Sequence, residues 1–276
     1  MFSEGIHSLV DTGNQGLILY GMARARKPAD EIHPFGYGME LYFWSFVVAI
    51  LIFAVGAGVS IYEGVQKIRQ PHPVTDAYIN YAVLGVAFVV EGAAWWAALK
   101  QFRQAKGEAG YFQAVRDSKD AALFTILFED SAAMLGLIVA FLGIFLGQAF
   151  NLPILDGMAS VLIGLILAVV AMLLAYECKG LLVGESADTA VIGGIRAIAM
   201  NEAGVLGVNE LRTMHLGPKD ILLNISLDFG GSLTADDVEQ LISKLERDIK
   251  AAYPAVTRIF VEAQSLRGHH ADKSQK

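Results

Sequence analysis

The stretch from Asp120 to Gln148 has the sequence DAALFTILFEDSAAMLGLIVAFLGIFLGQ. It is longer than the roughly 20 apolar residues that a helix needs to cross a bilayer. About ten residues into it lie two adjacent carboxylates, Glu129 and Asp130. An aspartate at the bilayer centre costs about 2.5 to 3.5 kcal/mol on insertion scales, so such residues are rare and usually functional. The stretch therefore predicts a transmembrane helix with an acidic site.

The composition of the whole chain agrees with a membrane protein. Of its 276 residues, 54% are hydrophobic and 18% are charged, and the mean hydropathy is +0.47, which is far from the values of soluble globular proteins. We expect an α-helical membrane bundle. Its five predicted spans are approximately residues 5–22, 40–66, 79–99, 120–148 and 153–178.

Several classes of function are disfavoured by the sequence. The single cysteine, Cys178, allows neither an internal disulfide nor a cysteine-rich metal site. A net charge of -7 disfavours a nucleic-acid partner. The sequence contains neither a GxxxxGK loop for nucleotide phosphates nor the HExxH pair of a metalloprotease, so we do not expect an enzyme.

Basic residues indicate the orientation, because Lys and Arg near short loops stay on the cytoplasmic side. They gather after the first span and between the third and fourth spans. This pattern predicts that the segment after residue 180 is cytoplasmic and that the N-terminus is exterior. The residues concerned are Arg24, Arg26, Lys27, Lys100, Arg103, Lys106, Arg116 and Lys119.

The segment after residue 180 has the composition of a small soluble α+β domain. Hydrophobic periodicity predicts the order αββαβ. The expected elements are a helix over 188–201, strands over 206–216 and 220–228, a helix from Thr234 to Pro254 and a strand over 258–263. The predicted domains are therefore a transmembrane domain over 1–180, an α+β domain over 181–266 and a disordered polar tail over 267–276.

Ionisable residues inside the first and fourth spans form a candidate metal site. His7 and Asp11 are four residues apart and share one helix face, which Asn14 extends by one turn. With Glu129 and Asp130 they offer nitrogen and oxygen ligands that suit zinc, manganese or ferrous iron. The alternative is that His7 and Asp11 only hydrogen-bond each other and hold two helices together.

Glu91 lies in the middle of the third span, where a carboxylate is also costly. The sequence names no partner for it. A proton carrier, a structural pair and a residue at the lipid edge all remain open.

Four motifs resemble those of the cation diffusion facilitator family. EGIHSLVDTGNQ (4–15) is similar to its second transmembrane helix and HPFGYG (33–38) to the entry into its third. DGMAS (156–160) is similar to the start of its sixth helix, and GESAD (184–188) to the junction with its cytoplasmic domain. The αββαβ order also resembles the family's ferredoxin-like C-terminal domain.

The resemblance implies a homodimer of six-helix subunits in the plasma (inner) membrane. Such proteins export a divalent metal, here zinc with manganese or iron as alternatives, in exchange for protons, and hold no permanent cofactor. The implied metal ligands are His7, Asp11 and Asp130, with Glu129 as an auxiliary ligand and Asn14 as a further candidate. The Glu129-Asp130 pair resembles the branch that includes mitochondrial zinc transporter nine.

This sequence departs from the family pattern in several places. The five spans correspond to helices two to six, so we expect a further helix upstream of Met1; an inactive truncated subunit or a membrane-anchored scaffold is the alternative. Ile126, four residues before Asp130, stands where many members have a ligand. Glu129 is offset from Asp130 by about 100° around the helix, so it must bend back to reach the site.

Two secondary metal sites of the family are depleted here. Asp30 and His33 match two positions of its loop site, but the third position is Tyr37, so we expect weak or no binding there. The cytoplasmic domain has Asn209, Val261 and Ala263 at expected ligand positions and keeps only His215. We therefore expect this domain to dimerise without metal.

Overall fold

The computed structural model describes residues 2–71, 77–106 and 119–273, with the side chains of residues 10–71, 78–104 and 119–269. The chain divides into two compact units. One unit comprises Met1–Pro28 and Glu40–Gly180, and the other comprises Ala29–Met39 and Leu181–Lys276. Residues 29–39 thus belong to the unit that contains the C-terminal domain, although they connect two helices of the first unit.

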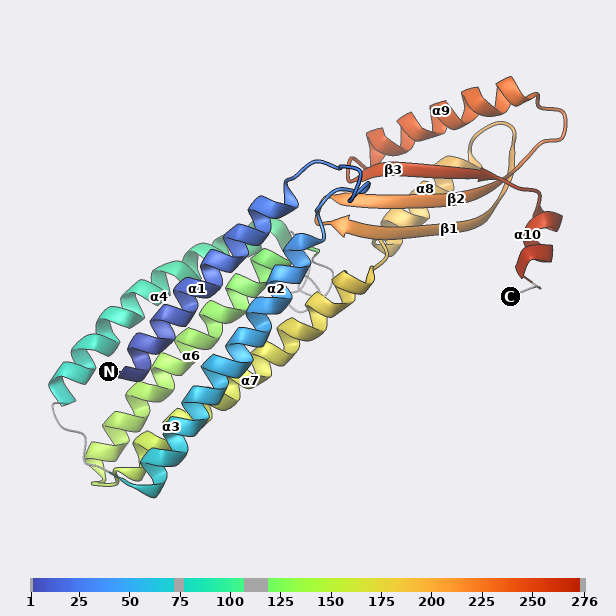
Figure 1. The fold of residues 1–276 in the computed structure, drawn as a ribbon. Coiled ribbons are helices and arrows are strands. Elements are labelled where there is room, and N and C mark those ends of the chain that lie inside the picture. Colours follow the sequence, from blue (N-terminus) through green and yellow to red (C-terminus); the bar gives the residue numbers. More distant parts are fainter. Residues whose placement is uncertain (1, 72–76, 107–118, 274–276) are drawn as a thin grey trace. The chain divides into compact units, whose positions relative to one another are not determined.

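The first unit is a bundle of long helices (Figure 1). They are α1 (Phe2–Ala25), α2 (Glu40–Leu51), the π-helical segment η1 (Ile52–Ala57), α3 (Gly58–Arg69), α4 (Ala77–Lys106), α6 (Ala121–Ala149) and α7 (Ile154–Val183). Within the described residues, four segments are long and apolar enough to span a membrane: Glu40–Arg69, Tyr78–Gln104, Ala121–Ala149 and Ile154–Val183. These confirm four of the five predicted spans.

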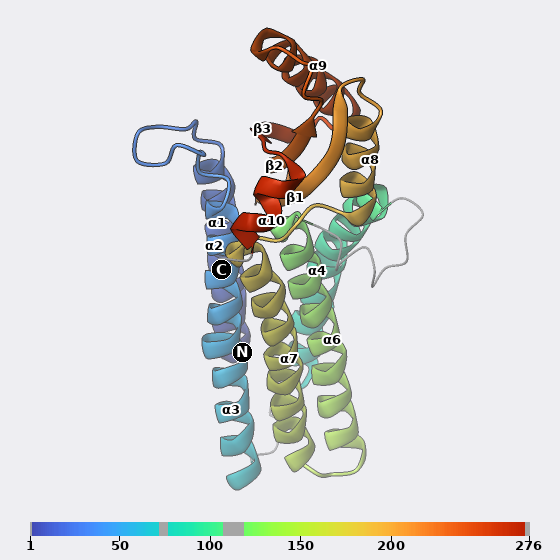
Figure 2. The same cartoon turned by 90° about the vertical axis from the view of Figure 1, so that its right-hand side faces the viewer.

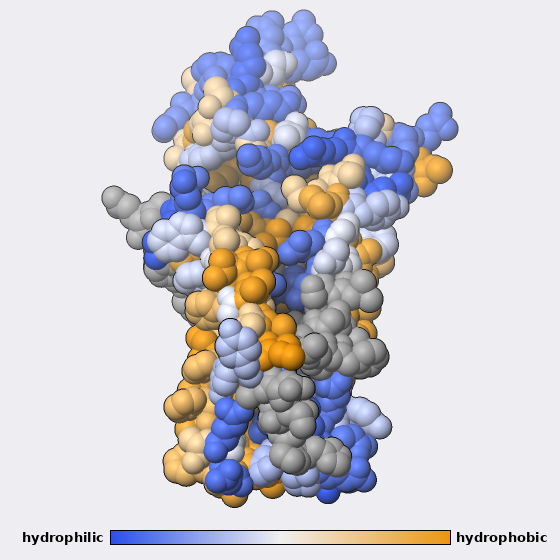
Figure 3. All heavy atoms as spheres, turned by 90° about the vertical axis from the view of Figure 1, so that its left-hand side faces the viewer, coloured by the Kyte–Doolittle hydropathy of each residue, from blue (hydrophilic) through white to orange (hydrophobic). Residues whose placement is uncertain are grey.

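The fifth predicted span, 5–22, coincides with α1, which is helical but is not one of the four apolar segments. Its sequence carries the polar residues Asp11, Asn14 and Gln15 within a little more than one turn. On the face drawn in Figure 3, hydrophobic residues gather along part of the helical unit, whereas the α+β unit is mostly hydrophilic.

Helices α3 and α7 pack with their backbones in contact (Figure 2). A Cβ atom at Gly64 would lie 2.7 Å from the Val161 nitrogen and 2.8 Å from the Gly157 oxygen. Only glycine allows helices to approach this closely. On the same two helices, Lys67 Nζ lies 3.0 Å from Asp156 Oδ2. Close packing and an ion pair therefore hold α3 against α7.

The α+β unit contains a three-stranded sheet of order β1-β2-β3, with β1 antiparallel and β3 parallel to β2. The strands are β1 (Val205–Gly217), β2 (Asp220–Phe229) and β3 (Val256–Ala263), and the helices are α8 (Thr189–Met200) and α9 (Ala235–Ala252). Ile195 of α8, Leu223 and Ile225 of β2, and Leu245 of α9 are fully buried together. The predicted αββαβ order is confirmed.

Side-chain caps fix where the two helices of this unit begin. The Asp188 carboxylate accepts a hydrogen bond from the Ala190 N–H at 2.7 Å. The Thr234 hydroxyl accepts one from the Asp237 N–H, and the Asp237 carboxylate accepts one from the Thr234 N–H, which makes a complete capping box. Both helix starts agree with the predicted ranges, 188–201 and Thr234 to Pro254, because capping is local in sequence.

A final helix, α10 (Leu266–Lys273), occupies most of the predicted tail. His269 is buried and its Nδ1 lies 3.1 Å from Gln264 Oε1. The Leu266 N–H donates a hydrogen bond to Asp228 Oδ2 at 3.4 Å. The prediction of disorder over 267–276 is therefore wrong for residues 267–273, because tertiary contacts order a segment that looks polar in sequence.

Candidate metal-transport site

A buried hydrogen bond joins the two helices that carry the predicted ligands. Asn14 Nδ2 of α1 donates to Glu129 Oε1 of α6 at 2.8 Å. Asn14 is 1% exposed and Glu129 is 7% exposed. Asn14 Oδ1 is buried and has no hydrogen-bond partner. Buried polar atoms normally have a partner. Asn14 Oδ1 is thus an oxygen atom that could coordinate a bound cation.

The two adjacent acidic residues of α6, Glu129 and Asp130, are both buried. Asp130 is 4% exposed and follows Glu129 directly. Asp11 of α1 and Glu129 line one small cavity of about 10 Å³. Its other walls come from Val10, Ile52, Gly56, Ala133 and Leu167. The cavity is close to the smallest size that holds a single water molecule, and its two polar walls are the carboxylates of Asp11 and Glu129.

The π-helical segment η1 lies beside this cavity, since Ile52 and Gly56 both line it. A π-helical turn widens the helix and is frequently found at functional sites. The sequence does not predict this π-helical segment, because the flanking residues have ordinary apolar helix character.

His7 lies in α1 four residues before Asp11, but its side chain is outside the described residues. Its role as a ligand stays a prediction. Among the side chains that the structure describes, no three His, Cys, Asp or Glu residues are arranged to hold a metal ion. Ile126 is half-buried on α6, as its apolar character predicts.

Glu129 was expected to reach the site only by bending back. The structure places its carboxylate against Asn14 of α1, so Glu129 and Asn14 meet at one point. Glu129 and Asn14 are therefore hydrogen-bonded to each other, and their roles as ligands stay predictions.

The structure also assigns surroundings to Glu91 of α4. Glu91 and Asp11 both lie within electrostatic reach of Glu129 and Asp130. Three helices thus contribute carboxylates to one region. The sequence alone names no partner for Glu91, because the pairing of α4 with α6 depends on tertiary packing.

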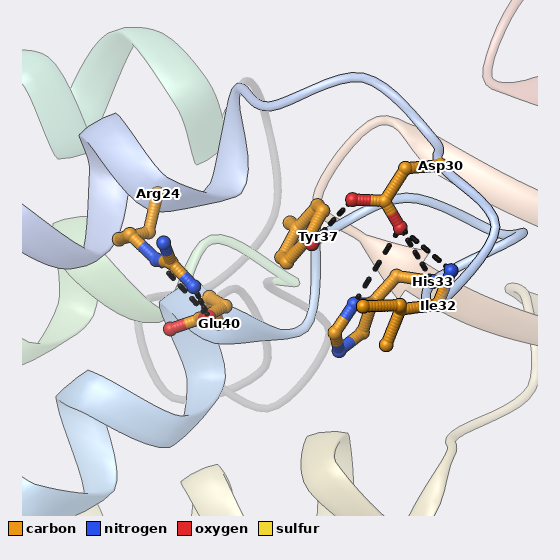
Figure 4. A network of polar contacts seen from close by, with 6 residues as sticks. All are labelled: Arg24, Asp30, Ile32, His33, Tyr37 and Glu40. Atoms are coloured by element: carbon orange, nitrogen blue, oxygen red, sulfur yellow. Dashed lines mark hydrogen bonds and ion pairs between the residues drawn. The ribbon is translucent and has the colours of Figure 1, made fainter.

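Asp30 and His33, for which we expect weak or no metal binding, take part in hydrogen bonds within their own loop (Figure 4). The Tyr37 hydroxyl donates to Asp30 Oδ2 at 2.6 Å, and the N–H groups of Ile32 and His33 donate to Asp30 Oδ1 at 3.0 and 2.7 Å. The Tyr37 hydrogen bond and that of the His33 N–H hold the pKa of Asp30 below its ordinary value. His33 Nδ1 is 3.8 Å from Asp30 Oδ1. Both oxygens of Asp30 therefore already have donors.

The same loop packs on the sheet of its own unit. The Phe35 ring lies 6.5 Å from the Phe260 ring, edge to face, and the Arg258 guanidinium lies 5.6 Å above Phe35. In the helical unit, a separate ion pair joins Arg24 of α1 to Glu40 of α2 at 2.8 Å (Figure 4). Neither contact was predicted from the sequence.

In the α+β unit, His215 is 5% exposed and its Nδ1 lies 3.3 Å from the Gly217 carbonyl oxygen. Asn209 donates to the Gln264 carbonyl oxygen at 2.6 Å. These contacts agree with a structural role for both residues.

Two family models match the chain. A cation efflux transmembrane domain matches residues 1–183, and a cation efflux protein cytoplasmic domain matches residues 187–264. The C-terminal unit is accordingly the cytoplasmic domain of an integral membrane protein. The match of the membrane domain alone covers more than half of the chain.

Curated relatives agree with these models. The human protein "Proton-coupled zinc antiporter SLC30A9, mitochondrial" is 31% identical over 255 residues, covering 89% of this chain and 45% of its own length. "Metal tolerance protein C4" of Arabidopsis thaliana is 28% identical over 241 residues, covering 86% of this chain and 52% of its own. This chain therefore spans about half the length of these relatives.

A bacterial relative is matched over most of its length. "Manganese efflux system protein MneP" of Bacillus subtilis is 22% identical over 261 residues, covering 95% of this chain and 84% of its own. Among solved structures, the MamM CTD covers 28% of this chain and 98% of its own at 22% identity, with a TM-score of 0.27. From the two domain matches and the identity to the human antiporter, the chain belongs to the cation efflux family.

Proposed function

We propose that this chain exports zinc from the cytoplasm in exchange for protons, through a site formed by His7, Asp11 and Asp130 with Glu129 as an auxiliary ligand. The observation that carries the proposal is the buried Asn14–Glu129 hydrogen bond, which joins α1 to α6 beside Asp11 and Asp130. The unpartnered Oδ1 of Asn14 adds an oxygen donor at the same place.

The chemistry of exchange follows from charge and burial. Several carboxylates that are taken out of water are strongly destabilised unless a cation or protons compensate them. Metal ligands must be deprotonated, so a metal ion and protons compete for the same groups. A site that opens alternately to either side of the membrane would then carry the metal one way and protons the other.

Zinc is the first candidate because imidazole and carboxylate ligands suit it, and because the human relative is named a zinc antiporter. Manganese is the second candidate, since oxygen ligands dominate the set and the Bacillus subtilis relative is named a manganese efflux protein. Iron is a third cation with the same ligand preferences.

The proposal includes a homodimer in the plasma (inner) membrane. The match to the cytoplasmic domain model supports dimerisation through residues 185–266. The human relative is named mitochondrial, so the membrane is to be established by fractionation of cells that express the tagged chain.

Proteoliposomes with an imposed pH gradient test the proposal. The chain should move zinc against its gradient, and Asp11→Asn and Asp130→Asn should each abolish this flux in a protein that stays monodisperse. Glu63→Gln is the matched control, because it makes the same change in a half-buried carboxylate of α3 away from the cavity. Absence of proton-dependent flux of zinc, manganese and iron in the unaltered chain would favour the inactive subunit or scaffold.

A further inference from the structure

Glu91 is a carboxylate at membrane depth that the proposed ligand set does not use. It lies on α4 and is half-buried. In the described part of the chain, no hydrogen bond or ion pair compensates its side chain. An ionisable residue inside a transmembrane helix is rarely retained without a partner or a function.

The packing of α4 on α6 fixes the level of Glu91. Trp95 Nε1 donates to Ser131 Oγ at 3.0 Å, and a Cβ atom at Gly92 would lie 3.9 Å from Met134. Earlier residues of α4 thus face later residues of α6, so the two helices are antiparallel. Glu91 is four residues before Trp95 on the same helix face, which places it about 6 Å along the axis from the level of Ser131.

The order of the helices shows toward which side of the membrane Glu91 is displaced from Ser131. α7 leads into the cytoplasmic domain, so α6, which precedes it and runs the opposite way, begins at the cytoplasmic side. Glu91 therefore lies on the extracytoplasmic side of Asp130. Asp11 is displaced in the same direction from Asn14, and it shares its cavity with Ala133, one turn beyond Glu129. Asp11 and Glu91 thus flank the acidic pair of α6 from two helices.

Electrostatics and one orphaned atom support a role in cation binding. Glu91 acts on both Glu129 and Asp130, as Asp11 does. Asn14, which is 1% exposed and donates to Glu129 through Nδ2, also carries a buried oxygen without a partner beside this acidic pair. Carboxylates from three helices together with an unsatisfied oxygen form an environment that attracts a divalent cation.

We propose that Glu91 is a further cation-binding residue, which receives the divalent cation from the Glu129–Asp130 pair on its way to the extracytoplasmic side. This inference rests on the proposed transport function. It adds an outer position at Glu91 to the proposed site of His7, Asp11, Asp130 and Glu129. A cation that approaches from outside should meet Glu91 before it meets Asp130.

Transport measured separately from each side of oriented vesicles tests this order. Zinc and manganese are the probes, and the apparent affinity is determined for cation added at the cytoplasmic face and, under a reversed gradient, at the extracytoplasmic face. Glu91→Gln should weaken the extracytoplasmic affinity fivefold or more and change the cytoplasmic affinity less than twofold. Glu63→Gln should match the unaltered chain at both faces, and Asp130→Asn should lose transport from both.

Two results would overturn the assignment: Glu91→Gln with unchanged affinity at both faces, or with equal weakening at both. Glu91→Asp keeps the charge and withdraws it by one methylene, so it should give an intermediate effect at the extracytoplasmic face alone. This second variant decides the question if Glu91→Gln is not monodisperse. Failure of the unaltered chain to transport would instead contradict the proposed function itself.

Discussion

The side-chain amide of Asn14 donates a 2.8 Å hydrogen bond to the carboxylate of Glu129, and both residues are buried. This bond is a direct polar contact between α1 and α6. It connects the helix with the His7–Asp11 motif to the helix with the acidic pair. A bond in this position both stabilises the bundle and sets the orientation of a candidate ligand.

Asn14→Leu should destabilise the chain by about 1 to 3 kcal/mol, because it leaves a buried carboxylate without its donor. Thermal unfolding in detergent, followed by circular dichroism, measures the effect. Gln148→Leu is the control, since it removes the exposed 3.0 Å bond from Tyr81 and should change stability by no more than about 0.5 kcal/mol. Equal effects of the two substitutions would show that burial of the Asn14 bond contributes nothing.

Glu129→Gln separates the two roles of Glu129. The amide oxygen can still accept the hydrogen bond from Asn14, so the fold should be retained while the negative charge is lost. We expect zinc flux to fall about tenfold, which corresponds to about 1.4 kcal/mol, rather than to vanish as in Asp130→Asn. Flux equal to that of the unaltered chain would make Glu129 a purely structural residue.

Gly64→Ala should disrupt the contact between α3 and α7, because the new Cβ would lie 2.7 to 2.8 Å from backbone atoms of Val161 and Gly157. Overpacking of this kind costs about 1 to 3 kcal/mol. Gly85→Ala in α4 is the matched control, since nothing lies within 4 Å of its Cβ position. There the change should be neutral or stabilising by up to about 1 kcal/mol. Melting temperatures in one detergent compare the pair, and a neutral Gly64→Ala would contradict the close packing.

The sequence predicted those parts of the fold whose signals are local. Four apolar spans, the helix starts near Asp188 and Thr234, and the strand over 220–228 each depend on neighbouring residues, and the structure confirms them. It did not predict what depends on distant pairing. The contact of Phe35 with Phe260 and the approach of Glu91 to Asp130 join residues far apart in the chain, and no local pattern encodes them.

In the candidate site, too, the sequence predicts the local features but not the contacts between distant residues. The helix spacing of His7, Asp11 and Asn14 was accessible from the sequence, because residues four apart share a face. The pairing of Asn14 with Glu129 was not, since the rotation of α6 relative to α1 is set by packing of the whole bundle. The prediction of disorder was wrong for α10, because contacts with Gln264 and Asp228 order this polar segment.

Tyr37→Phe should loosen the loop of residues 29–39. The hydroxyl donates to Asp30, whose other oxygen holds the N–H groups of Ile32 and His33. Hydrogen exchange of the Ile32 and His33 amides should rise severalfold at neutral pH. Added zinc should not slow this exchange in either protein, because both Asp30 oxygens already have donors. Protection by zinc that depends on His33 would restore the loop as a metal site.

The order of this loop should also depend on pH. The pKa of Asp30 is lowered by the Tyr37 hydrogen bond and the His33 N–H, so its stabilising contribution is present above the unfolded value of about 3.9 and is lost as the pH falls through the lower folded value. Exchange in the loop, corrected for intrinsic rates, should therefore rise only in acid. In Tyr37→Phe the rise should begin at a higher pH, since the largest cause of the lowered pKa is gone.

The final prediction concerns metal in the cytoplasmic domain. His215 is buried with its Nδ1 near the Gly217 carbonyl oxygen, and Asn209 is engaged with the Gln264 backbone, so neither side chain is arranged as an open ligand. We expect that this domain dimerises without metal and that cytoplasmic zinc does not gate the chain. The test is isothermal titration of zinc into the Asp11→Asn/Asp130→Asn double variant, which lacks two carboxylates of the proposed membrane site. Titration should show no stoichiometric submicromolar binding, and adding His215→Ala should lower the melting temperature without changing the titration. Tight binding that His215→Ala abolishes would instead identify His215 as part of a working metal sensor.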